Sequence, residues 1–239
     1  MYLPNIKEIL AGIERKEFEL FFQSIVDLKT GEVVGREGLA RWLHPDRGLL
    51  TPDLFVPTLD REGKTYRLCY EVIRLANAAE STDSSLWTSI NISPITLCRR
   101  DWRDHHPKIS SSIYIEVVES LYIDALIETA ICEMRNRGFK FSADDFGHGY
   151  LNFVHLSKRL FDIVKLDISV IRNICNDLES ARRCAGLIKL IHDLGMKVVA
   201  EGVESSAQAR LLISMGCDMG QGFLWDTPKA SPKILPQLS

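Results

Sequence analysis

The stretch GFKFSAD, residues 138–144, joins a glycine, a short apolar strand and a terminal carboxylate. The same pattern returns as GMKVVAE at residues 195–201, and one residue shorter as GCDMGQ at residues 216–221, where an amide replaces the carboxylate. In the first two copies the glycine follows a helix-like segment, and glycine commonly ends helices. The repeat therefore predicts helices that alternate with short buried strands, each strand ending in a polar side chain.

Strand-like and helix-like segments alternate along most of the remaining chain. Further strands are expected at 18–27, 33–43, 86–93, 112–119 and 161–167, and helices at 66–80, 124–137 and 181–194. Single helices between strands are typical of a parallel sheet with crossover connections. About eight strands in a chain of this length favour an α/β fold, a modified (β/α)8 TIM-type barrel with an irregular first strand. The glycine motifs that bind nucleotides in open doubly wound sheets are absent from the sequence.

The composition is that of an ordinary globular protein. Charged residues make up 26% and hydrophobic residues 46% of the chain, and the formal net charge is −3. A nearly neutral chain argues against DNA, RNA or an anionic membrane as a partner held by bulk charge. Charged residues interrupt the apolar residues of 1–22 as in an amphipathic helix, so this segment does not resemble a signal peptide. No apolar run of about 18 residues predicts a membrane span.

We expect two parts, a helical lead-in at residues 1–17 and a single barrel domain at residues 18–239. The tail at 227–239 is expected to form a terminal strap. The six cysteines are scattered, with no C-x-x-C motif and no metal-type spacing. Most are expected on apolar faces, where a free thiol behaves as a small hydrophobe. A reducing cytoplasm fits this pattern best.

The active site of a barrel of this kind lies at the carboxyl ends of the strands. The polar residues expected there are Glu37, Asn91, Glu116, Asp144, Asp145, Lys165, Asp167, Glu201 and Gln221. Carboxylates that converge on one mouth repel one another and need compensating cations. Because the ligand set offers carboxylate and amide oxygens without histidine or cysteine, it suits Mg²⁺ or Mn²⁺ better than Zn²⁺.

The pair Asp144 and Asp145 is informative, because neighbours in a strand point to opposite faces. Both can serve one site only where the strand breaks, and we expect Gly147 and Gly149 to provide that break. An aspartate pair there suits the bridging of two cations for displacement at a phosphodiester. Taken singly, a strand-end acid is more often solvated or capping, so Asp145 could be an N-cap and Lys165 a salt-bridge partner. The histidines lack ligand spacing, and the tryptophans are expected to pack.

The stretch GREGLARWLHP, residues 35–45, places Glu37 and Arg41 on the same strand face as Leu39, which is costly in a core unless something charged lies between them. It resembles the signature Glu-Ala-Leu segment of the EAL-domain phosphodiesterases of bacterial cyclic di-GMP signalling. Other segments resemble the remaining motifs of that family in order: INISP, IEVVES, ADDFGHGY, VKLD, AEGVE and GQGF. The resemblance covers residues 18–228, nearly the whole chain.

This resemblance implies a role for each matched residue. The ligands of two divalent cations, Mg²⁺ or Mn²⁺, would be Glu37, Asn91, Glu116 and Asp144 for one, and Asp144, Asp145 and Glu201 for the other. The catalytic residues would be Glu37, Lys165, Glu201 and Gln221. The residues in contact with cyclic di-GMP would be Gln23, Leu39, Arg41 and Asp167. The implied reaction is hydrolysis of cyclic di-GMP to linear pGpG, which would control biofilm, fimbriae or motility.

The sequence departs from the family pattern at several positions. Gly38 stands where the family has alanine, Ser24 where it has proline, and Val118 where it has threonine. The loop after Asp145 carries the unusual residues His148, Leu151 and Asn152. In the family this loop couples the metal site to a dimer interface, so we expect a homodimer with a working, retuned loop.

Two other functions stay open. A degenerate member would bind cyclic di-GMP or a protein partner without hydrolysis, although no metal ligand is lost here. An unrelated zinc-dependent barrel hydrolase would need an H-x-H pair at a strand end, and the chain has none. No GGDEF-like, receiver or sensor segment precedes the barrel, so activity is expected to follow expression level or self-association.

Overall fold

A closed barrel of eight strands forms the centre of the computed structural model, which describes residues 3–105, 108–118, 125–147, 156 and 158–230. The barrel strands are β1 (Phe18–Asp27), β2 (Val33–His44), β4 (Trp87–Asn91), β5 (Ile113–Val118), β6 (Lys140–Phe146), β7 (Ile163–Leu166), β8 (Lys197–Ala200) and β9 (Met219–Gly220). From β2 to β9 each strand runs parallel to the next in the ring. The expected TIM-type barrel with an irregular first strand is confirmed.

The first strand, β1, runs antiparallel to both of its neighbours, β2 and β9. Its register with β2 places Gln23 opposite Glu37. This antiparallel strand is the irregular first strand that the sequence predicts. The connection to β2, residues 28–32, is too short for the crossover that a parallel pair needs. It turns tightly instead, and Asp27 Oδ1 accepts a hydrogen bond from the Thr30 amide.

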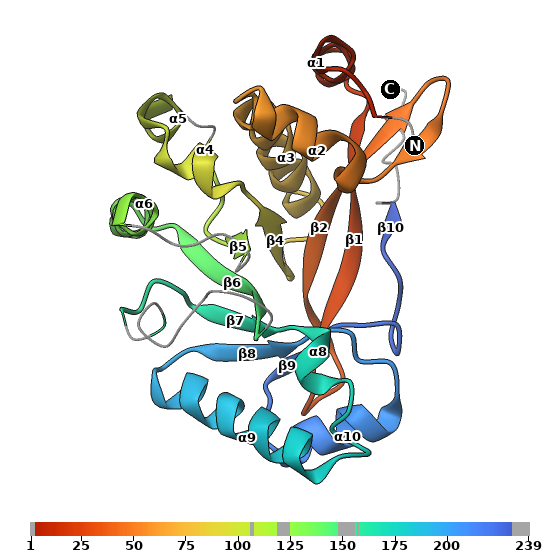
Figure 1. Ribbon diagram of the computed structural model, residues 1–239, viewed down its shortest axis with the longest axis vertical. Coiled ribbons are helices and arrows are strands. Elements are labelled where there is room, and N and C mark those ends of the chain that lie inside the picture. The colour runs from red at the N-terminus through yellow and green to blue at the C-terminus, as the bar shows by residue number, and fades with distance from the viewer. Residues whose placement is uncertain (1–2, 106–107, 119–124, 148–155, 157, 231–239) are drawn as a thin grey trace.

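Helices cover the outside of the barrel (Figure 1). They are α1 (Ile6–Glu14), α2 (Pro52–Arg61), α3 (Thr65–Glu80), α4 (Pro94–Cys98), α5 (Arg100–His105), α6 (Ala125–Asn136), α8 (Ile168–Ile171), α9 (Leu178–Asp193) and α10 (Ser206–Ser214). The capping role expected for residue 124 falls outside the described residues. No helix in the described part of the chain is both long and apolar enough to cross a bilayer.

The helix α1 lies within the lead-in expected at residues 1–17 and packs on the barrel. Asn5 caps it by accepting a hydrogen bond from the Glu8 amide. Its apolar face carries Ile9 and Ile13 into the main core, and Glu8 Oε1 lies 3.0 Å from His44 Nε2 on β2. This helix therefore shares its core with the barrel.

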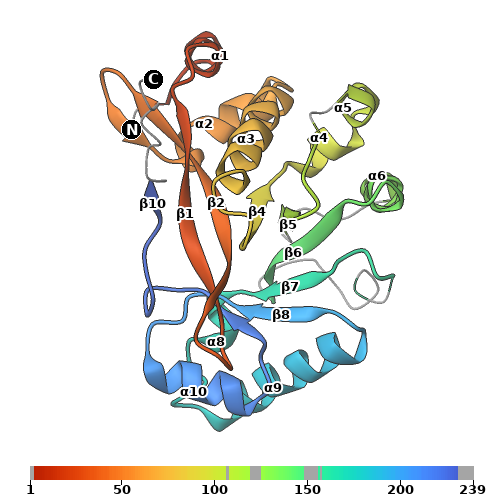
Figure 2. The ribbon, with the colours of Figure 1, turned by 180° about the vertical axis from the view of Figure 1, so that it is seen from behind.

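Two short strands extend the sheet. β3 (Gly48–Leu50) pairs with the end of β2, and β10 (Lys229–Ala230) pairs with β1 at Phe21 and Phe22. Figure 2 shows β10 running beside β1. The start of the expected terminal strap thus lies along the barrel as far as Ala230, and residues 231–239 lie outside the described part of the chain.

The interior of the barrel contains two layers of side chains. The lower layer is an apolar cluster near the amino ends of the parallel strands, with Trp87 and Tyr114 packed against it: Ile25, Ile163, Val199 and Met219. Two residues along the same strands, alternation brings polar side chains into the interior. We call these the upper layer: Gln23, Lys165, Glu201 and Gln221, together with Glu37, Asn91, Glu116 and Asp144 from the neighbouring strands.

Candidate active site

Lys165, which is 1% exposed, places its ammonium group in the middle of the upper layer. Its Nζ lies 2.7 Å from Glu201 Oε1, 2.9 Å from Asp144 Oδ1 and 3.0 Å from Glu116 Oε1. Glu37 Oε2 is 3.4 Å away. One buried positive charge thus faces four carboxylates. The rest of their charge must be met by bound protons or by metal ions.

Two amide side chains hold Glu37, and each donates a hydrogen bond to a different oxygen of its carboxylate. Asn91 Nδ2 donates to Glu37 Oε1 over 3.3 Å and to Glu116 Oε2 over 3.2 Å. Gln221 Nε2 donates to Glu37 Oε2 over 2.6 Å and to Gln23 Oε1 over 3.1 Å. The carboxylate of Glu37 is therefore fixed in place by residues at the ends of two other strands, Asn91 on β4 and Gln221 after β9.

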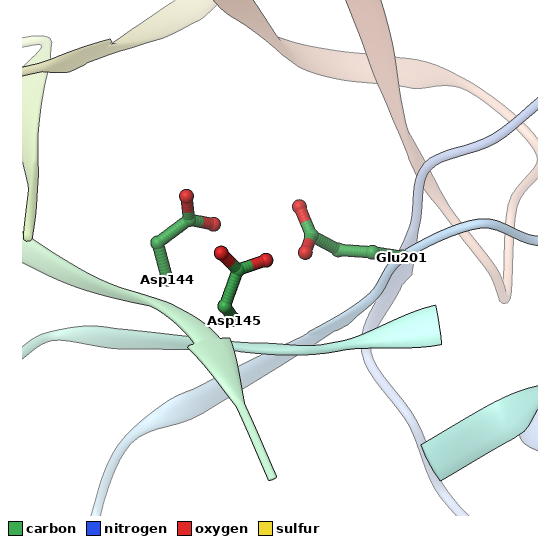
Figure 3. Close-up of side chains that lie close together, drawn as sticks. All are labelled: Asp144, Asp145 and Glu201. Atoms are coloured by element: carbon green, nitrogen blue, oxygen red, sulfur yellow. The ribbon is translucent and has the colours of Figure 1, made fainter. Parts of the chain in front are cut away.

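Three carboxylates converge at the ends of β6 and β8. Oxygens of Asp144, Asp145 and Glu201 lie within 4.8 Å of one another, and Figure 3 shows the three side chains pointing toward one another. Oxygen atoms at this spacing could hold a hard divalent cation.

Asp145 reaches this cluster because β6 bulges at that residue. Its φ is +57°, in the left-handed region, and the pairing of β6 with β7 shifts register between Ala143 and Phe146. A bulge re-aims a side chain, so the two neighbouring aspartates face one site. The sequence-based expectation that Gly147 provides the break is corrected, since the break lies two residues earlier, inside β6. Gly149 falls outside the described residues.

Burial raises the pKa values of several carboxyl groups in the site. It raises the pKa of Glu201 to about 8, against the opposing charge of Lys165. Burial, with repulsion from Asp144, raises the pKa of Asp145 to about 6. Burial also holds the pKa of Glu116 well above its usual value. Glu201 therefore keeps its proton at neutral pH, and a bound cation would release it.

Glu37 and Lys165 behave differently from that group. Burial acts to raise the pKa of Glu37, but the charge of Lys165 and the hydrogen bond from Gln221 outweigh it, and the pKa lies below its usual value. Burial acts to lower the pKa of Lys165, but the surrounding carboxylates raise it well above the usual value. The pair is therefore ionised across the neutral range.

Two cavities adjoin the upper layer, and Leu39 lines both. The smaller, of about 340 Å³, is also lined by Gln23, Glu37, Asp145, Asp167, Glu201, Gln221 and Phe223. The larger, of about 450 Å³, is lined by Asn91 and by residues of α2, α3 and the start of α4. An elongated ligand centred on the carboxylates could therefore extend into a cavity at each end.

Several residues that line these cavities were not expected from the sequence. Phe223, whose side chain is 68% exposed, lines the smaller cavity two residues after Gln221. Pro52 and Asp53 of α2 line the larger one. Phe223 is the last residue of the matched segment GQGF, which could have indicated it, but the position of α2 depends on packing that has no local sequence signal.

Two residues expected to contact the ligand lie at the edge of the site. Asp167 lines the smaller cavity and caps α8, where its Oδ1 accepts a hydrogen bond from the Ser169 amide. Arg41 donates from Nη1 to the Ala40 carbonyl over 2.9 Å, and its guanidinium lies 5.9 Å from the centroid of the Phe21 ring. Neither cavity is lined by Arg41.

The residues that depart from the family pattern fall in different surroundings. A Cβ added at Gly38 would lie 3.3 Å from both Leu20 Cδ1 and Phe22 Cε1, on the outer face of β2. Ser24 is hydrogen bonded to Asp226. The side chain of Val118 and the loop residues lie outside the described part of the structure: His148, Leu151 and Asn152.

Comparisons with known proteins agree with this geometry. The family model described as "EAL domain" matches residues 6–228. The cyclic di-GMP phosphodiesterase RocR of Pseudomonas aeruginosa is 28% identical, over 99% of this chain and 64% of RocR. Among solved structures, PaMucR phosphodiesterase in complex with c-di-GMP superposes with a TM-score of 0.83 at 26% identity, covering 96% of this chain and 99% of that one.

A second solved structure carries both a cation and the dinucleotide. The calcium and cyclic di-GMP complex of Klebsiella pneumoniae BlrP1 has a TM-score of 0.75 at 26% identity, covering 91% of this chain and 57% of BlrP1. The chain spans between 34% and 39% of the length of several other curated relatives. The chain belongs to the EAL domain family.

Proposed function

We propose that the protein is a metal-dependent phosphodiesterase that hydrolyses cyclic di-GMP to linear pGpG. The observation that carries this proposal is the upper layer of the barrel, where three buried carboxylates and the half-buried Glu201 surround one lysine and two cavities adjoin the layer. By lowering the level of the dinucleotide in the cytoplasm, the enzyme would act on biofilm, fimbriae or motility. A homodimer is part of this proposal, from family analogy.

The residues of the site fit divalent cations. Within the described part of the chain, the buried atom Gln221 Oε1 has no hydrogen-bond partner, although buried polar atoms normally have one. The donors are oxygens, which suits Mg²⁺ or Mn²⁺. The ligands would be Glu37, Asn91, Glu116 and Asp144 for one cation, and Asp144, Asp145 and Glu201 for a second. When bound, such cations lower the pKa of water and neutralise phosphate charge.

Two residues of the chain would manage the attacking water. Lys165 Nζ donates the hydrogen bond that orients the water toward phosphorus, in line with the departing 3′ oxygen. Glu201 Oε1, 2.7 Å from Lys165 Nζ, accepts the proton of that water. Gln221 and Asn91 hold Glu37 in place and keep the carboxylates from moving apart. Positioned groups of this kind act without reorganisation during the reaction.

The two cavities match the shape of the proposed substrate. Cyclic di-GMP carries two bases on either side of a phosphodiester ring, so one base can occupy each cavity while a phosphate lies over the carboxylates. In the smaller cavity the exposed ring of Phe223 offers an aromatic face for stacking. Gln23, Leu39 and Asp167 would line the path of the dinucleotide, and Arg41 would reach its outer phosphate by leaving the Ala40 carbonyl.

A cyclic di-GMP receptor without hydrolysis is the second candidate. It is favoured by the departures at Val118 and at the loop residue His148, because Val118 follows the carboxylate residue Glu116 by two positions and His148 follows Asp145 by three. Such a receptor would bind cyclic di-GMP in the two cavities but would not hydrolyse it.

The test is to incubate purified protein with cyclic di-GMP and Mg²⁺ or Mn²⁺ and to separate the products. Native protein is expected to release linear pGpG, and Glu37→Ala to release none. Ile163→Val, a change in the apolar lower layer of the same barrel, serves as the matched control and should keep the activity. Dinucleotide binding without product from the native protein would favour the receptor.

A further inference from the structure

The edge of β1 that faces away from β2 carries a gap in its strand pairing. On that edge, β10 pairs with Phe21 and Phe22, and β9 pairs with Val26 and Asp27. Between them, residues 23–25 have no strand partner on that edge within the described part of the chain. Backbone groups at such a gap still need hydrogen-bond partners.

Asp226 fills this gap with its side chain. One carboxylate oxygen accepts the backbone N–H of Ser24 over 3.2 Å, and the other accepts the Ser24 hydroxyl over 2.7 Å. Hydrogen bonds to a carboxylate are stronger than those between neutral groups. A proline at position 24, as in the family pattern, would supply neither donor. The pair of Ser24 and Asp226 is thus a feature of this chain.

The backbone of Asp226 acts on the inward side of the same strand. Its carbonyl accepts a hydrogen bond from Gln23 Nε2 over 3.2 Å. Gln23 Oε1 in turn accepts from Gln221 Nε2, and that same nitrogen donates to Glu37 Oε2 over 2.6 Å. A continuous chain of hydrogen bonds therefore runs from Asp226 to the carboxylate of Glu37.

The turn that carries Asp226 is fixed at its other end. The Gly222 carbonyl accepts the amides of Trp225 and Asp226, and the Leu224 amide donates to the Val203 carbonyl. The residue exposed at the top of this turn is Phe223. Asp226 therefore connects this turn to β1 through its hydrogen bonds with Gln23 and Ser24.

We propose that Asp226, held by Ser24, is a positioning residue that fixes Glu37 through Gln23 and Gln221. The inference rests on the proposed metal-dependent function of Glu37. If Asp226 moves, Gln23 loses an acceptor, Gln221 loses its fixed partner, and Glu37 loses orientation at its Oε2. Groups that orient a metal ligand contribute about 10-fold to 100-fold in metal affinity or activity.

The test compares Asp226→Ala, Asp226→Asn and Ser24→Ala with native protein. Mn²⁺ is titrated by calorimetry, and exchange of the Ser24 amide is followed by NMR in metal-free protein. Asp226→Ala is expected to weaken Mn²⁺ binding about 10-fold and to speed exchange of the Ser24 amide. Asp226→Asn keeps an acceptor for that amide and a donor for the hydroxyl, so it should restore both properties. Ser24→Ala should lie between, because the backbone bond remains.

Asp193→Ala serves as the control, since Asp193 forms an exposed ion pair with Lys189 on α9, and it should match native protein in both measurements. Unchanged Mn²⁺ affinity in Asp226→Ala with faster exchange at Ser24 would overturn the positioning role. Unchanged exchange of the Ser24 amide in Asp226→Ala would overturn the proposed link between Asp226 and Ser24. If native protein binds Mn²⁺ but does not hydrolyse cyclic di-GMP, the proposed reaction fails while the positioning role is still measured.

Discussion

The two layers of the barrel interior are built by the same strands and have opposite character. On β7, Ile163 belongs to the lower layer and Lys165 to the upper one. Likewise, Val199 of β8 belongs to the lower layer, and Glu201, the residue directly after β8, belongs to the upper one. The lower layer gains stability by removing apolar surface from water. The upper layer concentrates charge that burial penalises. The comparison indicates that the lower layer holds the barrel together, while the upper layer gathers more carboxylates than its one lysine can neutralise.

The largest expected effect comes from Lys165→Met. It removes the buried cation and leaves four carboxylates without it, so the free energy of unfolding of metal-free protein should fall by about 3–5 kcal/mol. Urea unfolding in EDTA measures the change, and excess Mg²⁺ should recover part of it. Ile163→Val on the same strand should cost about 1 kcal/mol whether or not Mg²⁺ is present. If Mg²⁺ changed the free energy of unfolding of both variants equally, the proposed difference between the two layers would be contradicted.

The pH dependence of stability gives a smaller effect. Burial raises the pKa of Glu201 to about 8 and that of Asp145 to about 6, so the folded protein keeps protons that the unfolded chain has lost. Stability from these groups is full below about pH 4 and is lost as the pH rises through 6 and 8. Urea unfolding in EDTA should show a fall on the order of 2 kcal/mol between about pH 6 and pH 8.

Saturating Mg²⁺ should reverse this trend, because cation binding favours the ionised carboxylates. A metal-free protein whose stability rises over the same interval would contradict the assigned protonation of the upper layer.

The smallest effect is expected from Gly38→Ala, which restores the alanine of the family signature. Position 38 faces away from both interior layers, and the new methyl group would meet Leu20 and Phe22 at 3.3 Å. The lower entropy of the unfolded chain offsets this tight contact, so stability should change by less than about 1 kcal/mol. Rates of cyclic di-GMP hydrolysis should stay within a factor of about two, corresponding to roughly 0.4 kcal/mol. A large loss of hydrolytic activity in Gly38→Ala would show that the arrangement of the upper layer depends on packing at the outer face of β2.

The sequence predicted the barrel and the residues of the upper layer because strand ends and family motifs are local patterns. The direction of β1 needed attention to residues 28–32, whose shortness excludes a crossover. The left-handed conformation of Asp145 had no local signal beyond the neighbouring glycines, since non-glycine residues rarely adopt it. The cavity wall from α2 and the contact of Asp226 with Ser24 join segments far apart in the chain, so periodicity could not reveal them.

The measurement that tests the central claim most directly is anomalous X-ray scattering from crystals of the protein soaked in Mn²⁺. We expect manganese peaks in the upper layer, one beside Glu37, Asn91 and Glu116 and one among Asp144, Asp145 and Glu201. Well-ordered crystals without manganese in the upper layer, with Lys165 still contacting all four carboxylates, would contradict it.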